Sequence, residues 1–258
     1  RERVFGLIDQ GRDVPVVWVA GPPGSGKTSL ITSYLAARRL PCLWYQIDER
    51  DADIATFFYY MGMAAKKAAP KKKKPMPLLT REYLTGVPAF TKRYFEELFS
   101  RLSLGEPTPA LPSPFRKPRK SKTGQFVIVL DNYQDMPVSS GLHRIINYGL
   151  DLIPEGINIF VLSRREPPPH FARLRANNKM KFITWNELKF TLEESQKLFG
   201  MKAKRKPAPE VLAKLHKKTD GWVAALILII LSSEIVGIDI HSIREFPTKE
   251  IYDYFAIE

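Results

Sequence analysis

Short runs of apolar residues recur along the first 186 residues of the chain and alternate with longer segments of helical periodicity. These runs predict buried strands at residues 15–20, 42–47, 126–130 and 157–163, with a shorter fifth candidate at 181–184. Strands that are apolar along their whole length are typical of a parallel sheet covered on both faces. The alternation therefore predicts an α/β fold with a three-layer arrangement.

The segments between these runs carry the spacing of helices. Residues 30–39 follow the first strand, and a second helical segment starts at Asp53. Two further helices are predicted by apolar positions that share one face, namely Phe95, Leu98, Phe99 and Leu102, and then Leu142, Ile145, Ile146, Leu150 and Ile153 before Pro154. Residues 103–124 are rich in Pro, Ser, Lys and Arg without periodicity, and we expect a mobile loop there.

The alternation ends after residue 186, where only helical signals follow. Thr191 and Glu194 form a capping box, Pro209 suits the first turn of a helix, and the Gly221 region opens the last one. The apolar run at 222–231 is too short to cross a bilayer and predicts a buried helix. We expect a nucleotide-binding domain at 1–186, a small helical domain at 187–245, and the start of a following, truncated domain at 246–258.

The chain of 258 residues carries a net charge of +13. Much of the positive charge lies in two segments, and neither segment contains an acidic residue. Lys66, Lys67 and Lys71–Lys74 form one, and Arg116, Lys117, Arg119, Lys120 and Lys122 form the other. Such runs are usually solvated loops, but contact with DNA, an acidic partner or a neighbouring subunit is the alternative. A single cysteine and four scattered histidines predict a reducing, cytoplasmic location without structural zinc. The short apolar run at 222–231 predicts no membrane partner.

One motif predicts the ligand. Gly21, Pro22, Pro23, Gly24, Ser25, Gly26, Lys27 and Thr28 match the P-loop pattern G-x-x-x-x-G-K-[ST], with Ser29 following. Glycines let backbone N–H groups surround phosphate oxygens, Lys27 neutralises the β- and γ-phosphates, and the Thr28 hydroxyl binds Mg²⁺. A strand before the motif and a helix after it supply the context that this Walker A interpretation requires.

A magnesium-binding P-loop protein also needs an acid at the tip of a buried strand. Asp131 follows the apolar run at 126–130 and fits this Walker B role. The next residue, Asn132, could orient the attacking water or take no part in the chemistry. An amide cannot accept the proton of that water, so we expect slow turnover. Asp135 could substitute for it, although a solvated or capping aspartate is the simpler interpretation.

Five stretches together resemble the STAND class of signal-transduction ATPases, specifically the nucleotide-binding domain of large LuxR-type, MalT-like transcription regulators. They are GPPGSGKTSL at 21–30, LWYQIDERDADIATFFYY at 43–60, VLDNYQDM at 129–136, VLSRREPPPHFARLR at 161–175 and KTDGWVAALIL at 218–228. The resemblance implies an additional-strand P-loop sheet of order 5-1-4-3-2. It also implies that ATP or ADP is bound with Mg²⁺.

The resemblance further suggests roles for single residues. Arg164 would sense the terminal phosphate from the end of the fourth strand, unless it is a surface charge. Trp222 would lie near the nucleotide, although a tryptophan at a helix start is more often a core residue. Arg3 and Val4 lie in the segment that passes the adenine in related proteins.

The resulting expectation is a weak ATPase that serves as a switch in signal transduction and transcription regulation. The full-length protein would self-associate when it holds ATP and an unknown inducer, and would bind DNA through a module outside this chain. Two other classes stay open. One is a P-loop small-molecule kinase with the basic segment at 103–124 as its lid, and the other is an ATPase that acts on nucleic acid through its lysine-rich loops.

Overall fold

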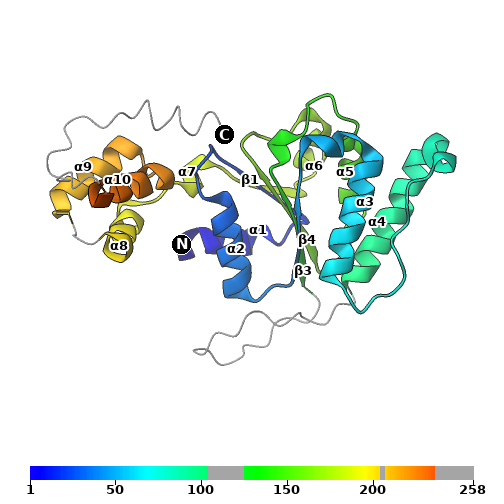
Figure 1. The fold of residues 1–258 in the computed structure, drawn as a ribbon, viewed down its shortest axis with the longest axis horizontal. Coiled ribbons are helices and arrows are strands. Elements are labelled where there is room, and N and C mark those ends of the chain that lie inside the picture. Colours follow the sequence, from blue (N-terminus) through cyan, green and yellow to red (C-terminus); the bar gives the residue numbers. More distant parts are fainter. Residues whose placement is uncertain (104–124, 204–206, 236–258) are drawn as a thin grey trace. The chain divides into compact units, whose positions relative to one another are not determined.

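The computed structural model describes residues 1–103, 125–203 and 207–235 (Figure 1). Its contacts divide the chain into two compact units. The sheet unit contains Phe5–Ala20 and Thr28–Ile183, and the helical unit contains Arg1–Val4, Gly21–Lys27 and the residues from Thr184 onward. Each unit is described separately below. The residues of the phosphate-binding loop motif up to Lys27 thus pack with the helical unit.

The sheet has five parallel strands in the order β2-β3-β4-β1-β5. They are β1 (Val16–Ala20), β2 (Cys42–Gln46), β3 (Phe126–Asp131), β4 (Ile157–Ser163) and β5 (Met180–Ile183). All five predicted strands are present, and the predicted order 5-1-4-3-2 is confirmed. Because β4 lies between β1 and β3, the end of β1 that leads into the P-loop is separated from Asp131 by one strand.

Helices cover both faces of this sheet. They are α1 (Glu2–Gly11), α2 (Lys27–Arg38), α3 (Ile54–Ala68), α4 (Val87–Ser103), α5 (Leu142–Leu150) and α6 (Ala172–Ala176), with 3-10 turns at Glu49–Ala52, Arg81–Gly86, Tyr133–Asp135 and Pro169–Phe171. Asp53 caps α3 by accepting from the N–H groups of Ala55 and Thr56, which explains why the helical pattern starts there. Helix α1 was not predicted, because only its segment RERVF had been considered.

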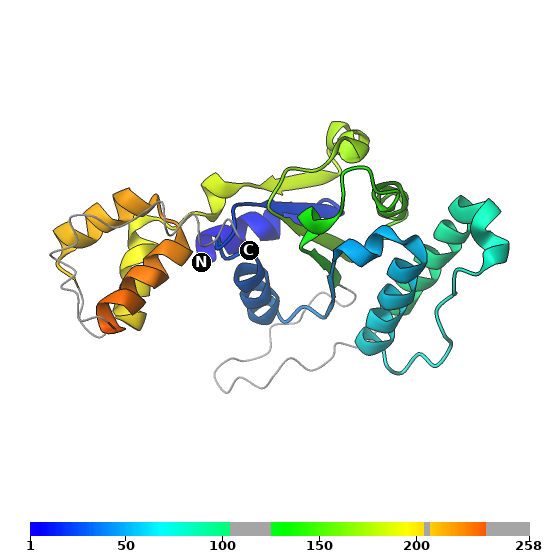
Figure 2. The same ribbon diagram turned by 45° about the horizontal axis from the view of Figure 1, so that its top comes forward.

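Alternate residues along each strand point to opposite faces, which divides the core of the sheet unit in two. Trp18, Ile128 and Val161 belong to a large cluster built with α3, α4, α5 and α6. On the other face, Tyr34 of α2 packs against Phe160 of β4 and against Phe5 of α1. Figures 1 and 2 show the sheet between these two groups of helices, which confirms the predicted three-layer arrangement.

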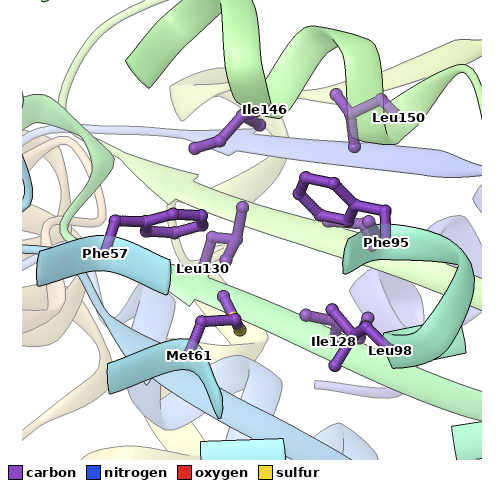
Figure 3. Close-up of a pocket in the computed structure, with 9 residues that line it drawn as sticks. Phe57, Met61, Phe95, Leu98, Ile128, Leu130, Ile146 and Leu150 are labelled. Carbon is purple, nitrogen blue, oxygen red and sulfur yellow. The ribbon is translucent and has the colours of Figure 1, made fainter. Parts of the chain in front are cut away.

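The larger half of the core is closely packed. In Figure 3, side chains of α3, α4 and α5 converge on Ile128 and Leu130 of β3. The space left between them is about 10 Å³, and it is lined by apolar side chains alone. A space of this size and polarity holds no ligand, so it is an imperfection in packing and not a binding site.

Gly149 of α5 allows close approach of α4. A Cβ added there would lie 2.5 Å from the Phe95 ring. We expect Gly149→Ala to lower the free energy of unfolding by about 1–3 kcal/mol through overpacking, and to lower Tm by a few degrees. Thermal and urea unfolding would measure this. The matched control is Gly6→Ala in α1, where nothing lies within 4 Å, and equal stability of both variants would contradict the packing argument.

The helical unit consists of α7 (Trp185–Leu188), α8 (Leu192–Lys202), α9 (Pro209–Thr219) and α10 (Val223–Ile235). The predicted capping box is present, since Thr191 accepts from the Glu194 N–H and Glu194 accepts from the Thr191 N–H. Pro209 begins α9, as expected. Among the described residues, no helix combines the length and apolarity needed to span a membrane. The predicted loop beyond Ser103 and the segment at 246–258 lie outside the described residues.

Candidate functional site

The P-loop backbone has the conformation that its glycines allow. Gly24 and Gly26 have φ angles of 65° and 81°, in the left-handed region where a side chain is strained. The Ser25 N–H donates to the Pro22 carbonyl at 3.2 Å and closes a turn. The segment that follows β1 and precedes α2 therefore forms a compact loop, as the motif predicted.

Lys27 lies over this loop. Its Nζ donates to the carbonyl oxygens of Gly21 and Pro22 at 2.7 and 3.1 Å, and to the Ser25 Oγ at 3.2 Å. Ser25 is buried, so its hydroxyl is a fixed partner. These contacts hold the positive charge of the lysine at the mouth of the loop, where phosphate oxygens would meet it.

The carbonyl side of the loop is held by the start of α10. The indole Nε1 of Trp222 donates to the Pro23 carbonyl at 3.0 Å, and the Ala224 N–H donates to the Gly24 carbonyl at 3.3 Å. In a trans peptide the N–H points away from the C=O, so the Gly24 N–H points away from Trp222. Trp222 is 3 % exposed, so it is a core residue of the helical unit that also contacts the loop.

Close packing explains why two loop positions are glycine. A Cβ at Gly24 would lie 2.5 Å from the Ala224 Cβ, and a Cβ at Gly21 would lie 2.8 Å from the Leu188 side chain. The motif predicted these glycines for phosphate contact alone. The structure adds that α7 and α10 need the same space.

The sheet unit, taken by itself, contains the two predicted magnesium-binding residues, Thr28 and Asp131. The Thr28 hydroxyl donates to Asp131 Oδ2 at 3.1 Å, and the Asn132 N–H donates to Asp131 Oδ1 at 2.9 Å. Asp131 is 6 % exposed, at the end of β3. A threonine hydroxyl and a carboxylate brought together in this way are the protein groups that magnesium uses in P-loop sites.

Asn132 occupies an unusual conformation directly after that carboxylate. Its φ of 59° places it in the left-handed region, which asparagine tolerates better than most residues. Asp135 ends the following 3-10 turn, and its N–H donates to the Asn132 carbonyl at 3.0 Å. Its carboxylate accepts from Gln134 Nε2 at 3.0 Å, so Asp135 stabilises the turn.

No sequence motif indicates a role for Gln134. Its Oε1 accepts from the backbone N–H of Arg164 at 3.0 Å, which ties the turn after β3 to the end of β4. Arg164 itself is exposed and directly follows β4. The place of Arg164 directly after the fourth strand was predicted from the sequence. Its link to Gln134 could not be predicted, because no spacing rule connects the two residues.

The N-terminal candidates Arg3 and Val4 belong to the helical unit, where Arg3 contacts α7 and α8. Arg3 donates to the carbonyl oxygens of Glu187 and Lys189 at 2.9 and 3.1 Å, and Val4 is fully buried. Arg1, which was not considered, pairs with Glu194 at 3.1 Å. Burial alone would raise the pKa of Glu194, but the Thr191 N–H, Arg1 and Arg3 together lower it. These contacts give Arg3 a structural role, and its contact with a base stays a prediction.

The residues present fit a nucleotide with magnesium. The loop has the glycine conformations that allow N–H groups to face phosphates, and Lys27 adds positive charge. Thr28 and Asp131 are already joined by a hydrogen bond at 3.1 Å, so both oxygens can serve one cation or its water shell. The arrangement can bind phosphates and polarise them.

Comparisons with known proteins agree with this fold. No family model matches the chain. It is 24% identical to the HTH-type transcriptional regulator MalT of Vibrio campbellii and 25% identical to that of Vibrio cholerae, over 100% of its own length. The chain spans about a quarter of the length of these relatives, covering 27% of each.

Two solved structures share the fold. One is a Signal Transduction ATPase with Numerous Domains that carries a tetratricopeptide repeat sensor, from Pyrococcus horikoshii, with a TM-score of 0.61 and 15% identity over 99% of this chain and 31% of that one. The other is a Walker-type ATPase of Pyrococcus abyssi, with a TM-score of 0.54 and 15% identity over 93% of this chain and 68% of that one. Homologues of the chain are therefore MalT regulators, and its structural neighbours are STAND and Walker-type ATPases.

Proposed function

We propose that this chain is the ATP-binding, slowly hydrolysing switch domain of a MalT-like, LuxR-type transcription regulator. The observation that carries the proposal is the hydrogen bond of 3.1 Å between Thr28 and Asp131, directly after a complete P-loop. A P-loop alone indicates phosphate binding. The added carboxylate indicates a metal-dependent nucleotide, which is the ligand that a switch ATPase uses.

Each part of the site has a separate role in this proposal. Backbone N–H groups of the loop and Lys27 bind the β- and γ-phosphates, and Thr28 and Asp131 hold Mg²⁺. When bound, the magnesium neutralises developing charge on the phosphate oxygens. Ser25 and the carbonyls of Gly21 and Pro22 keep the Lys27 ammonium in place before a ligand arrives.

Slow hydrolysis follows from the residue after the metal ligand. Asn132 can hydrogen-bond a water but cannot take its proton. Asp135, the other candidate base, already accepts a hydrogen bond from Gln134 Nε2 at its Oδ1, at 3.0 Å. A long-lived ATP state suits a switch, in which the time spent in each state carries the signal.

The contacts of α10 with the loop support a coupling between nucleotide and helices. The Pro23 and Gly24 carbonyls accept from Trp222 and Ala224, and the Gly24 N–H, in the same peptide as the Pro23 carbonyl, points away from Trp222 to where phosphate would bind. Any change in loop conformation on nucleotide exchange alters these two hydrogen bonds. Such a differential contact is what a ligand-driven switch requires.

We further propose that Arg164 distinguishes ATP from ADP, and we expect Arg164→Ala to reduce the ratio of their affinities by about tenfold. A hydrogen bond to a charged group contributes about 1.5–3 kcal/mol, and only ATP offers the γ-phosphate. Titrating both nucleotides by isothermal calorimetry with Mg²⁺ would measure the ratio. Arg165→Ala removes the neighbouring exposed charge and is the matched control. If the two variants keep the same ratio as the original chain, Arg164 is not the sensor.

In the full-length protein, the ATP-bound form would self-associate when an inducer is present and would bind DNA through another module. The expected compartment is the cytoplasm. The kinase alternative rests on the basic segment at 103–124 as a lid, which lies outside the described residues beyond Ser103. The P-loop domain at 1–186 and the small helical domain at 187–245 stay the proposed organisation, with the loop bonded to α10.

A further inference from the structure

Exposed apolar side chains gather on α3 and the segment after it. Tyr59, Tyr60, Met63 and Leu78 are 50, 51, 53 and 58 % exposed. The rings of Tyr59 and Tyr60 lie 5.2 Å apart in an edge arrangement. Single exposed apolar side chains are ordinary, whereas a group of them on one helix face indicates a binding surface.

Part of this apolar group forms the wall of a hollow of about 200 Å³. Tyr59, Met63 and Leu78 line it together with the buried Phe58 and Met76. The lining also includes the basic side chains of Lys66 and Lys72–Lys74. The hollow thus combines an apolar interior with a cationic rim.

A second hollow, of about 370 Å³, shares part of that rim. Lys71–Lys74, Glu97, Ser100 and Arg101 line it. Lys72, Lys73, Lys74 and Arg101 belong to both hollows. An apolar space and a polar, basic space therefore lie next to each other with common walls.

The charge of the two hollows is strongly unequal. Among the residues that the structure describes, six cationic side chains line them, against the single carboxylate of Glu97. That carboxylate already accepts from Lys74 at 3.1 Å and lies 3.7 Å from Arg101. Arg101 is buried and also donates to the Lys74 carbonyl, so it is a fixed positive charge behind the lysines. The surface is built to attract anions.

We propose that this surface, defined by Tyr59, Met63, Leu78 and Lys71–Lys74, binds single-stranded nucleic acid. A planar base fits the apolar hollow beside Tyr59, and the backbone phosphates fit the lysine-lined hollow next to it. Basic grooves with aromatic side chains for base stacking are the general chemistry of such sites. Six cationic side chains are more than one phosphate group can contact. This number favours a nucleic-acid strand with several phosphates over a mononucleotide.

An acidic polypeptide would satisfy the lysines but fits the apolar hollow less well. An amphipathic acidic helix presents a row of side chains several residues long. The hollow of about 200 Å³ has room for a single base or a single side chain. The surface lies within the sheet unit and uses none of the P-loop residues, so the proposal is independent of the nucleotide switch.

The test is fluorescence anisotropy of a labelled oligothymidine of about 12 nucleotides with the 258-residue chain, at about 50 to 200 mM salt. We expect binding that weakens with salt. Lys72→Gln combined with Lys73→Gln should weaken binding about tenfold and lower the salt slope by about 1.4, since each single-strand phosphate contact contributes about 0.7. Tyr59→Ala should weaken binding by about tenfold through lost stacking.

Matched controls separate this surface from general charge and exposure. Lys214→Gln combined with Lys217→Gln removes two exposed charges from α9, and Tyr148→Ala removes an exposed tyrosine of α5. Neither should change the affinity, and Lys27→Ala should also leave it unchanged. Three outcomes overturn the proposal: no binding of the oligomer, equal loss in test and control variants, or displacement by polyglutamate or AMP at equal phosphate or carboxylate concentration.

Discussion

Lys27→Ala is expected to abolish nucleotide binding, with an affinity loss of about 100-fold or more. The ammonium lies at the mouth of the loop, bonded to the Gly21 and Pro22 carbonyls at 2.7 and 3.1 Å. Its removal leaves the β- and γ-phosphates without their nearest positive charge. Each charged hydrogen bond lost costs about 1.5–3 kcal/mol, and about 2.8 kcal/mol corresponds to 100-fold.

Thermal unfolding with and without MgATP gives a direct measurement. A ligand at about 100 times its dissociation constant stabilises a protein by about 2.7 kcal/mol, and this gain should vanish in the variant. Lys197→Ala, on the exposed surface of α8, is the matched control and should keep the gain. Lys27→Gln, which keeps a hydrogen-bond donor without the charge, tests whether loss of fold explains the result. An unchanged ATP affinity in both Lys27 variants would refute the P-loop assignment.

Asp131→Asn is expected to remove most of the magnesium dependence of ATP binding and to lower the already slow turnover by about 100-fold. The substitution keeps the shape of a side chain that is 6 % exposed but removes its charge. The hydrogen bond from the Asn132 N–H to Oδ1 can persist, so the local turn should stay intact. Phosphate release and ATP titrations across a range of Mg²⁺ concentrations would measure both effects.

The control for Asp131 is Asp151→Asn, at the exposed C-terminal end of α5. It should leave Mg²⁺ dependence and turnover unchanged. If Asp131→Asn keeps the original rate and metal dependence, Asp131 is not part of the site. Two further variants, Asn132→Ala and Asp135→Asn, test whether either residue orients or activates the attacking water. Rapid hydrolysis that survives both changes would contradict the proposal of a slow switch.

The prediction of the sheet succeeded because its signals are local. Five apolar runs, each beside a helical segment, corresponded to the five strands within a residue or two at each end. The strand order came from the resemblance of the motifs and not from periodicity, since apolar runs carry no information about which strands are neighbours. Helix α1 was missed because its residues were considered only as a segment that passes the base.

The sequence motifs predicted that Thr28 and Asp131 lie together, and a hydrogen bond joins them, whereas their roles in binding a nucleotide stay predictions. Thr28 and Asp131 are 103 residues apart in sequence. Their proximity was still predictable, because the P-loop threonine and the strand-end acid of such proteins hold the same Mg²⁺. Gln134, Arg1 and Leu188 were not considered, since their partners lie far away in sequence and no spacing rule connects them. Trp222 was proposed to lie near the nucleotide or in the core, and the structure places it in the core with its indole on the loop.

By itself, the sequence determined the P-loop motif, the acid that ends β3, and the asparagine after that acid, because each depends on residue types at fixed local spacing. Tertiary structure alone decided that Trp222 and Ala224 hold the carbonyl side of the loop, from 199 residues away for Trp222. It also decided that Gln134 ties the end of β4 to the turn after β3. Such contacts arise from packing of elements distant along the chain, and packing depends on shapes that no local pattern encodes.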